Sequence, residues 1–262
     1  MYYAKKSLGQ NYLIDLNIVK KIINLTEIYK KDILEIGPGK GALTEQILNN
    51  KPKSLILIEK DNKLSEKLKF KYHKNKKINI FNEDILKFKL EDKVKKNSII
   101  FGNLPYNISS QILVKIIKFK IDPVKYSDLI FMFQKELANR ISGKFGTKDY
   151  GRLAVLANYN LNIFKKFDVS PNCFFPKPKV VSSILHFKKK IKKSIKIKNI
   201  ENLEKITNLL FSNRRKMINK NMKKIFKSYS QLKKIKDLNL SHRPSDITPE
   251  QYYKITKLFE RN

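Results

Sequence analysis

Short apolar runs alternate with helical patterns through the first two thirds of the chain, and this alternation constrains the fold more than any other feature. The pattern predicts strands at 33–36, 55–58, 78–81, 99–101 and 129–133. It predicts helices between them at 42–48, 62–71 and 110–119. Strands and helices that alternate at this spacing form βαβ units. We therefore expect an α/β fold with a Rossmann-like, doubly wound, mostly parallel sheet.

Two further segments, 164–169 and 180–187, predict paired strands joined by a proline-rich loop. A run of three lysines then ends at residue 190. Beyond it the apolar side chains recur at helical spacing, and no further strand is indicated. We predict a larger domain over residues 1–190 and a small, all-helical C-terminal domain over residues 191–262.

The chain is strongly basic, with 57 Lys and Arg against 23 Asp and Glu and a net charge of +34. A biased composition rich in Lys, Asn and Ile explains part of this excess, but it does not require acidic residues to be so scarce. Such a surface favours a polyanionic partner. Nucleic acid is favoured over an anionic membrane, because no basic segment has the clean apolar face that binds a bilayer.

Cysteine and histidine usage indicates the compartment and the metal content. Cys173 is the single cysteine, so no internal disulfide can form, and His73, His186 and His242 are too far apart in sequence to predict a metal cluster. The longest apolar runs are too short to span a bilayer. We expect a cytoplasmic monomer that holds no metal and does not enter a membrane.

A glycine-rich turn, residues 37–41, directly follows the first predicted strand and precedes a helix. In doubly wound folds this turn binds ligands that contain adenosine. Its spacing is neither the dinucleotide fingerprint nor a Walker loop. Pro38 also removes a backbone N–H that would bind a pyrophosphate. The turn therefore favours a nucleoside without phosphates, such as S-adenosylmethionine.

Two carboxylates follow the next two predicted strands. Glu59 ends the second strand, where an acidic side chain accepts hydrogen bonds from ribose hydroxyls. Asp84 follows the third strand, where a carboxylate can bind the adenine amino group. Either could be an ordinary strand-end carboxylate. Together with Gly37 and Gly39, they form an ordered set on three successive strand ends that predicts a cofactor site.

The fourth strand ends in Asn103-Leu104-Pro105-Tyr106. Pro105 keeps Leu104 extended, so this tetrapeptide leaves the sheet beside the glycine turn. An adenine amine is a poor nucleophile, because its lone pair is delocalised into the ring. The Asn103 side-chain carbonyl and the Leu104 backbone carbonyl can each accept one of its N–H groups and direct the lone pair at a sulfonium methyl. Tyr106 offers a flat face to hold the base.

A second aromatic cluster lies in the loop between the late strands, at residues 173–180. Its prolines stiffen the loop, and an exposed Phe174 could stack on the other face of the base. The alternative for Phe174 is packing in the core. We favour stacking.

The sequence resembles the ribosomal RNA adenine dimethyltransferases, most closely the bacterial KsgA type. The similarity runs through almost the whole chain. The segments that carry it are residues 6–13, 35–39, 103–110, 134–136, 150–153, 174–183, 213–216 and 243–245. Departures are mild. Leu8 and Tyr12 stand where Phe is usual, and Phe175 and Lys177 interrupt the proline run.

The resemblance implies a class I S-adenosylmethionine-dependent methyltransferase that releases S-adenosylhomocysteine and uses no metal. It places Asn11 and Leu13 with the strand-end residues and Asn103 around the cofactor. It also implies that Asn103, Tyr106 and Phe174 handle the target base. The implied substrate is a pair of adjacent adenines in the hairpin near the 3′ end of small-subunit rRNA, each dimethylated within an assembling ribosomal particle.

Three other functions remain as alternatives. Large-subunit rRNA methyltransferases that confer macrolide resistance share the fold and the chemistry, but Leu104 and the continuation through Ser110 favour the small-subunit type. A non-catalytic assembly factor would not need the glycine turn, Glu59 and Asn103. A nicotinamide dehydrogenase is the most distant alternative, because Pro38 does not serve hydride transfer.

Overall fold

The computed structural model describes residue 5 and residues 8–91, 93–119, 126–190, 195–226 and 232–261. Lys6 and Ser7, which belong to the N-terminal segment of the resemblance, lie outside the described residues. The chain divides into two compact units. One comprises Met1–Ala138 and Ile163–Lys189, and the other comprises Asn139–Asn162 and Lys190–Asn262.

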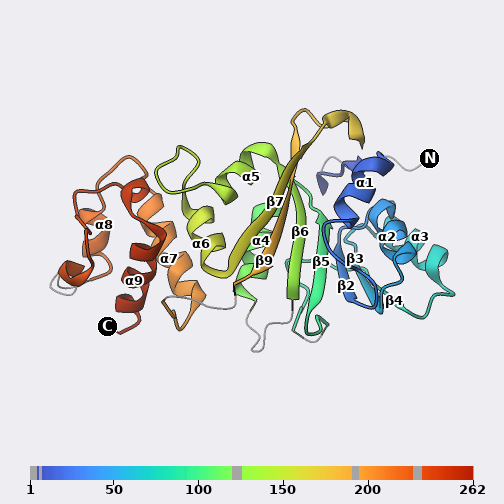
Figure 1. The fold of residues 1–262 in the computed structure, drawn as a ribbon, viewed down its shortest axis with the longest axis horizontal. Helices are drawn as coiled ribbons and strands as arrows, with labels where there is room; N and C mark the ends of the chain where they lie inside the picture. Colours follow the sequence, from blue (N-terminus) through green and yellow to red (C-terminus); the bar gives the residue numbers. More distant parts are fainter. Residues whose placement is uncertain are drawn as a thin grey trace. The chain divides into compact units, whose positions relative to one another are not determined.

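A seven-stranded sheet with the order β4-β3-β2-β5-β6-β9-β7 forms the centre of the first unit (Figure 1). The strands from β4 to β6 are parallel, and β9 is antiparallel to β6. The strands are β2 (Asp32–Ile36), β3 (Ser54–Ile58), β4 (Ile78–Phe81), β5 (Ser98–Asn103), β6 (Tyr126–Gln134), β7 (Leu161–Val169) and β9 (Ser182–Lys189). The predicted doubly wound, mostly parallel sheet is confirmed.

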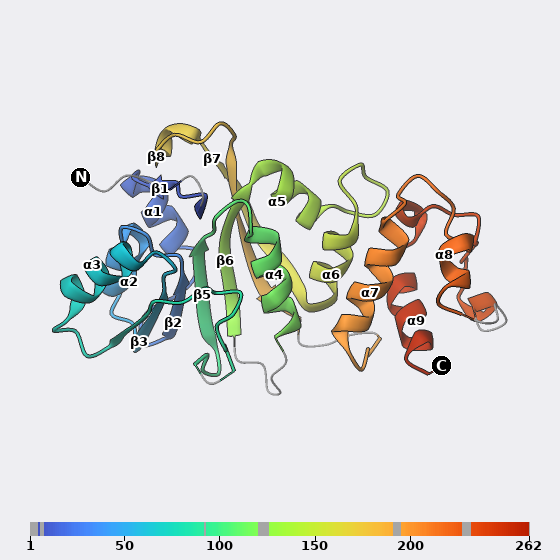
Figure 2. The same cartoon turned by 180° about the vertical axis from the view of Figure 1, so that it is seen from behind.

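Helices cover the sheet, as the alternating pattern predicts. They are α1 (Leu16–Ile23), α2 (Ala42–Asn49), α3 (Asn62–Tyr72), α4 (Ser109–Lys118) and α5 (Lys135–Ser142). Alternate strand residues, such as Ile33, Leu55 and Phe101, form one buried cluster with apolar side chains of α1, α2 and α3. Viewed from behind, α4 lies on the near side of the molecule, beside β6 (Figure 2). The core therefore fills the space between the sheet and its helices.

The order of the strands reverses between β2 and β5. From β2 the chain moves outward to β3 and β4, and it then returns to form β5 on the other side of β2. Ile36 pairs with Gly102, so the two strands end side by side. A crevice opens at such a reversal, beyond the carboxyl ends of the strands, and open α/β sheets bind ligands there. The glycine turn and Asn103 both emerge at this point.

A small second sheet holds the segment before α1 in place. It pairs β1 (Tyr12–Leu13) with β8 (Phe174–Phe175), which follows a short 3-10 helix, η2 (Pro171–Cys173). Asp15 then caps α1 by accepting hydrogen bonds from the backbone N–H groups of Asn17 and Ile18. The sequence patterns did not predict β1, β8 or α1.

The second unit is helical and contains α6 (Arg152–Asn160), α7 (Ile200–Phe211), α8 (Asn219–Lys223) and α9 (Pro249–Phe259), with 3-10 turns at η3 (Leu232–Lys234) and η4 (Pro244–Asp246). Its residues 195–226 and 232–261 contain no strand, as predicted. The predicted domain border places α6 with the sheet, whereas here α6 groups with the C-terminal helices. None of the helices in the described ranges combines the length and apolar character that crossing a membrane requires.

Hydrogen bonds join the segment that directly precedes α6 to the C-terminal part of the same unit. The Tyr150 hydroxyl donates to the Ile247 carbonyl at 2.8 Å. The Arg214 guanidinium donates to the carbonyls of Lys148 and Tyr150, at 2.7 and 2.9 Å. Two segments of the resemblance, around Tyr150 and Arg214, therefore contact each other within one helical unit.

Candidate active site

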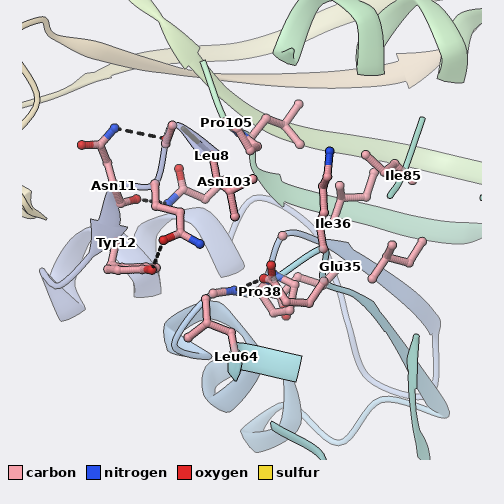
Figure 3. Close-up of a pocket in the computed structure, with 18 of the residues that line it drawn as sticks. Leu8, Asn11, Tyr12, Glu35, Ile36, Pro38, Leu64, Ile85, Asn103 and Pro105 are labelled. Carbon is pink, nitrogen blue, oxygen red and sulfur yellow. Dashed lines mark hydrogen bonds between the residues drawn. The ribbon is translucent and has the colours of Figure 1, made fainter. Parts of the chain in front are cut away.

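A pocket opens at the carboxyl ends of β2, β3 and β5 (Figure 3). The seven residues predicted to bind the cofactor all line it: Asn11, Leu13, Gly37, Gly39, Glu59, Asp84 and Asn103. The rest of the tetrapeptide after β5, Leu104, Pro105 and Tyr106, lines it as well. The structure thus brings the predicted cofactor residues and the predicted base-binding tetrapeptide to one place.

The glycine turn gives the pocket a floor made of backbone. Gly37 and Gly39 have φ angles of +68° and +57°, which side chains other than glycine rarely adopt. A Cβ atom at Gly39 would lie only 3.0 Å from the Tyr12 ring. The Gly37 N–H donates to the Ile58 carbonyl at 2.9 Å, which fixes the turn to the end of β3.

Glu59 holds this turn in position. One carboxylate oxygen accepts the Gly39 N–H at 3.0 Å, and the other accepts the Asp61 N–H at 2.9 Å. Burial raises the pKa of the Glu59 carboxyl, and these two backbone bonds oppose that rise. Each carboxylate oxygen can accept a second hydrogen bond. Glu59 is therefore both a structural clamp and an acceptor that faces the ligand space.

Asp84 lies at the rim of the pocket and forms an ion pair that sequence reasoning missed. Its carboxylate accepts the Lys60 ammonium at 2.8 Å and the Leu86 N–H at 2.9 Å. The bond from Lys60 holds the pKa of Asp84 below its ordinary value. A ligand amino group at Asp84 would share the carboxylate with Lys60.

The Asn103 amide has one defined orientation. Its Nδ2 donates to the backbone carbonyl of Asn11 at 3.0 Å (Figure 3). That bond uses the donor end of the side chain, which leaves Oδ1 as an acceptor at the end of β5. The contact also explains why a residue far back in the sequence, Asn11, belongs to the site.

Tyr106 is held by its hydroxyl, which lies 2.5 Å from the Oγ of Ser182 on β9. Burial raises the pKa of Tyr106, so the phenol stays neutral near pH 7. Ser182 is fully buried, and its contact with Tyr106 was not predicted. An aromatic ring fixed at its far end is suited to hold a flat ligand against one face.

Phe174 is the one predicted site residue that the structure places elsewhere. Its side chain is only 3% exposed and belongs to the buried cluster with Leu13 and Val19. Among the described residues that line the pocket, Phe174 does not occur. This position matches the core-packing alternative, and no stacking surface is visible at Phe174. The exposed ring in this strand is Phe175.

Known proteins match the chain over almost its whole length. The family model "Ribosomal RNA adenine dimethylase" matches residues 1–261. The chain belongs to this family. The ribosomal RNA small subunit methyltransferase A of Pelagibacter ubique is 43% identical over 98% of this chain and 97% of its own. The protein of the same name from Malacoplasma penetrans is 41% identical over 97% of this chain and 91% of its own.

Solved structures confirm the fold. A dimethyladenosine transferase from Plasmodium falciparum has a TM-score of 0.74 at 23% identity, and the match covers 95% of this chain and 97% of that one. The 23S rRNA methyltransferase ErmE has a TM-score of 0.69 at 21% identity, over 95% and 99% of the two chains. The class I methyltransferase fold predicted from the sequence is thereby confirmed.

Glu35 is a pocket residue to which the sequence analysis assigned no role. It lies on β2, is buried, lines the pocket, and accepts a 2.7 Å hydrogen bond from the Thr44 hydroxyl. Burial raises the pKa of its carboxyl to about 8. An acidic residue between the apolar residues Leu34 and Ile36 was the signal that could have identified it.

Proposed function

We propose that this protein transfers methyl groups from S-adenosylmethionine to the N6 amines of two adjacent adenines, in the hairpin near the 3′ end of small-subunit rRNA. The observation that carries the proposal is the Asn103 amide, oriented by Asn11 beside the Glu59-clamped glycine turn. The family and the names of the relatives support the substrate.

The lining residues fit S-adenosylmethionine. Gly37 and Gly39 present backbone instead of side chains, and Glu59 keeps acceptor capacity for ribose hydroxyls. We assign the adenine amino group to Asp84, and we place Asn11, Leu13 and Asn103 around the rest of the molecule. When bound, S-adenosylmethionine supplies an electrophilic methyl group on a cationic sulfur and becomes S-adenosylhomocysteine.

The tetrapeptide prepares the target amine. Asn103 Oδ1 accepts one N–H of the adenine amine, and the Leu104 carbonyl accepts the other. Both bonds draw the nitrogen lone pair out of conjugation with the ring, which makes it a better nucleophile. Because the Asn11 bond fixes the Asn103 amide beforehand, little reorganisation is needed during the reaction. Pro105 stiffens this turn, and the methylated amine is acidic enough to lose its proton to water.

Tyr106 holds the extruded base against its ring, supported by the bond to Ser182. The resemblance also assigns Phe174 to the base. Its buried position gives that role less support than Tyr106 has. A comparison of Phe174→Leu, which keeps the apolar bulk, with wild type tests whether an aromatic ring is needed there.

We further propose that residues 1–190 form the catalytic domain and that residues 191–262 form a helical domain that contacts an assembling small ribosomal particle. A second contact in the same chain raises affinity through effective concentration. The net charge of +34 suits a phosphate-rich particle. We infer that the protein acts as a monomer in the cytoplasm, where such particles assemble.

The test uses small and large subunits from cells that lack the enzyme, incubated with labelled S-adenosylmethionine. Label is expected in the small subunit only, and faster in particles than in naked small-subunit RNA. Label in the large subunit would instead assign the protein to the resistance type. Tight binding of the particle without label would identify a non-catalytic assembly factor.

A further inference from the structure

An exposed aromatic ring lies next to the pocket and has no part in the function proposed so far. Phe175 is 59% exposed, although burial of a large apolar side chain would stabilise the folded protein. It follows the buried Phe174 in β8 and is one of the two residues that interrupt the proline run typical of the family.

Phe175 belongs to a group of three side chains. Its register partner in β1 is Tyr12, which lines the pocket. The Lys40 ammonium lies 4.8 Å from the centre of the Tyr12 ring and 5.8 Å from the centre of the Phe175 ring. Lys40 is exposed and also lines the pocket, in the glycine turn. An exposed ring and an exposed cation therefore meet at the edge of the candidate active site.

A short series of contacts connects this group to the reacting residues. Asn103 donates to the carbonyl of Asn11, and the next residue, Tyr12, begins β1. Figure 3 shows Asn11, Tyr12 and Asn103 together on one side of the pocket. Tyr12 then pairs with Phe175 across the small sheet. Backbone pairing thus fixes the position of Phe175 relative to the Asn103 amide, which we propose binds the target base.

A nucleotide is the ligand that this combination suits. Every base has a face that stacks on an aromatic ring, and a lysine beside the ring attracts the phosphate. A base that leaves its stack exposes the face of its neighbour. We propose that Phe175 and Lys40 form a stacking platform for the nucleotide next to the target adenine. This inference rests on the proposed function and adds a second base-binding position to it.

The experiment compares Phe175→Ala, Phe175→Leu and Phe175→Tyr in the full chain. The matched control is Phe164→Ala, because Phe164 is 60% exposed and carries a lysine, Lys188, 5.1 Å from its ring centre, but does not line the pocket. Three quantities are measured: the KM for small subunits, the dissociation constant for S-adenosylmethionine, and the fluorescence of 2-aminopurine in a short oligoadenylate.

Removal of the flat ring should raise the KM for RNA about 5- to 100-fold in the Ala and Leu variants, which corresponds to the loss of one stacked base. The Tyr variant and the Phe164 control should match wild type, and affinity for S-adenosylmethionine should not change. Wild type is expected to quench the 2-aminopurine fluorescence, and this quenching should disappear with Phe175→Ala.

Three outcomes would overturn the platform. The first is normal KM and quenching in Phe175→Ala. The second is an equal loss of affinity for S-adenosylmethionine, which would assign the ring to the cofactor. The third is weaker binding of whole subunits with normal quenching, which would indicate a protein contact. If wild type methylates no adenine, the proposed function fails, whereas the quenching still tests the platform.

Discussion

The side chain of Asn103 carries a donor and an acceptor on the same amide, and only the acceptor can activate an adenine amine. The 3.0 Å bond from Nδ2 to Asn11 uses the donor and so assigns Oδ1 to the ligand. A carboxylate at this position would face the Asn11 carbonyl with an acceptor of its own. The amide is therefore the chemistry that this strand end requires.

We expect Asn103→Ala to lower the rate of methyl transfer by about 10²–10³, because the variant loses an oriented acceptor of the reacting amine. Affinity for S-adenosylmethionine should fall far less. Single-turnover kinetics and calorimetric binding separate the two effects. Asn50→Ala is the control, since Asn50 also donates its amide to a backbone carbonyl, that of Gln46, but on the exposed end of α2. Near-normal turnover of Asn103→Ala would refute the assignment.

Glu35 makes the stability of the protein depend on pH. Burial raises the pKa of its carboxyl from 4.5 to about 8, so the folded state binds a proton that the unfolded state releases. The stabilisation of the folded state that comes from this bound proton is complete below about pH 4.5, and it is lost as the pH rises to about 8. Glu35→Gln keeps an acceptor for Thr44 and cannot ionise.

The free energy of unfolding of Glu35→Gln, minus that of wild type, should therefore increase between pH 5 and pH 8. The increase should be a few kcal/mol, because each unit of pKa shift corresponds to ~1.4 kcal/mol. Urea denaturation without ligand at several pH values measures it. Glu66→Gln, at an exposed position of α3, is the control and should show a much smaller change. A difference that does not vary with pH would show that Glu35 is ionised in the folded protein.

At the scale of elements, the β1–β8 pair is a part of the site that the sequence patterns could not predict. Each strand has two residues, too few for any periodic pattern, and their pairing joins residues 12–13 with 174–175 across the chain. The pairing decides which Phe is buried. The sequence pattern favoured stacking for Phe174 over core packing, whereas the observed register places Phe174 in the core and Phe175 outside.

Phe174→Ala should lower the free energy of unfolding by about 3–5 kcal/mol, because it leaves a cavity in the core. Phe174→Leu should cost less than about 1.5 kcal/mol, and Phe175→Ala, on the exposed side, less than about 0.5. Urea denaturation gives all three values. Unchanged stability in Phe174→Ala together with a raised KM for RNA would instead support the base-stacking role.

At the scale of the whole molecule, the long periodic segments were predicted well. The strands from β2 to β6 and the helices α2, α3 and α4 lie within a few residues of their predicted positions, since burial on a parallel sheet leaves continuous apolar runs. The strand-end residues could be predicted because the topology brings them together. Contacts between distant segments, such as Asn11 with Asn103 and Tyr106 with Ser182, follow from no local pattern.

The number and position of methyl groups on ribosomal RNA test the central claim most directly. Small subunits from cells that lack the enzyme are incubated with the protein and S-adenosylmethionine, and the rRNA is digested and examined by mass spectrometry. The account predicts two methyl groups on the N6 of each of two adjacent adenines near the 3′ end and none in large-subunit rRNA. With Asn103→Ala, it predicts far fewer methyl groups on the same adenines after the same incubation time. Methylation of any other atom, or of large-subunit adenines, would contradict it.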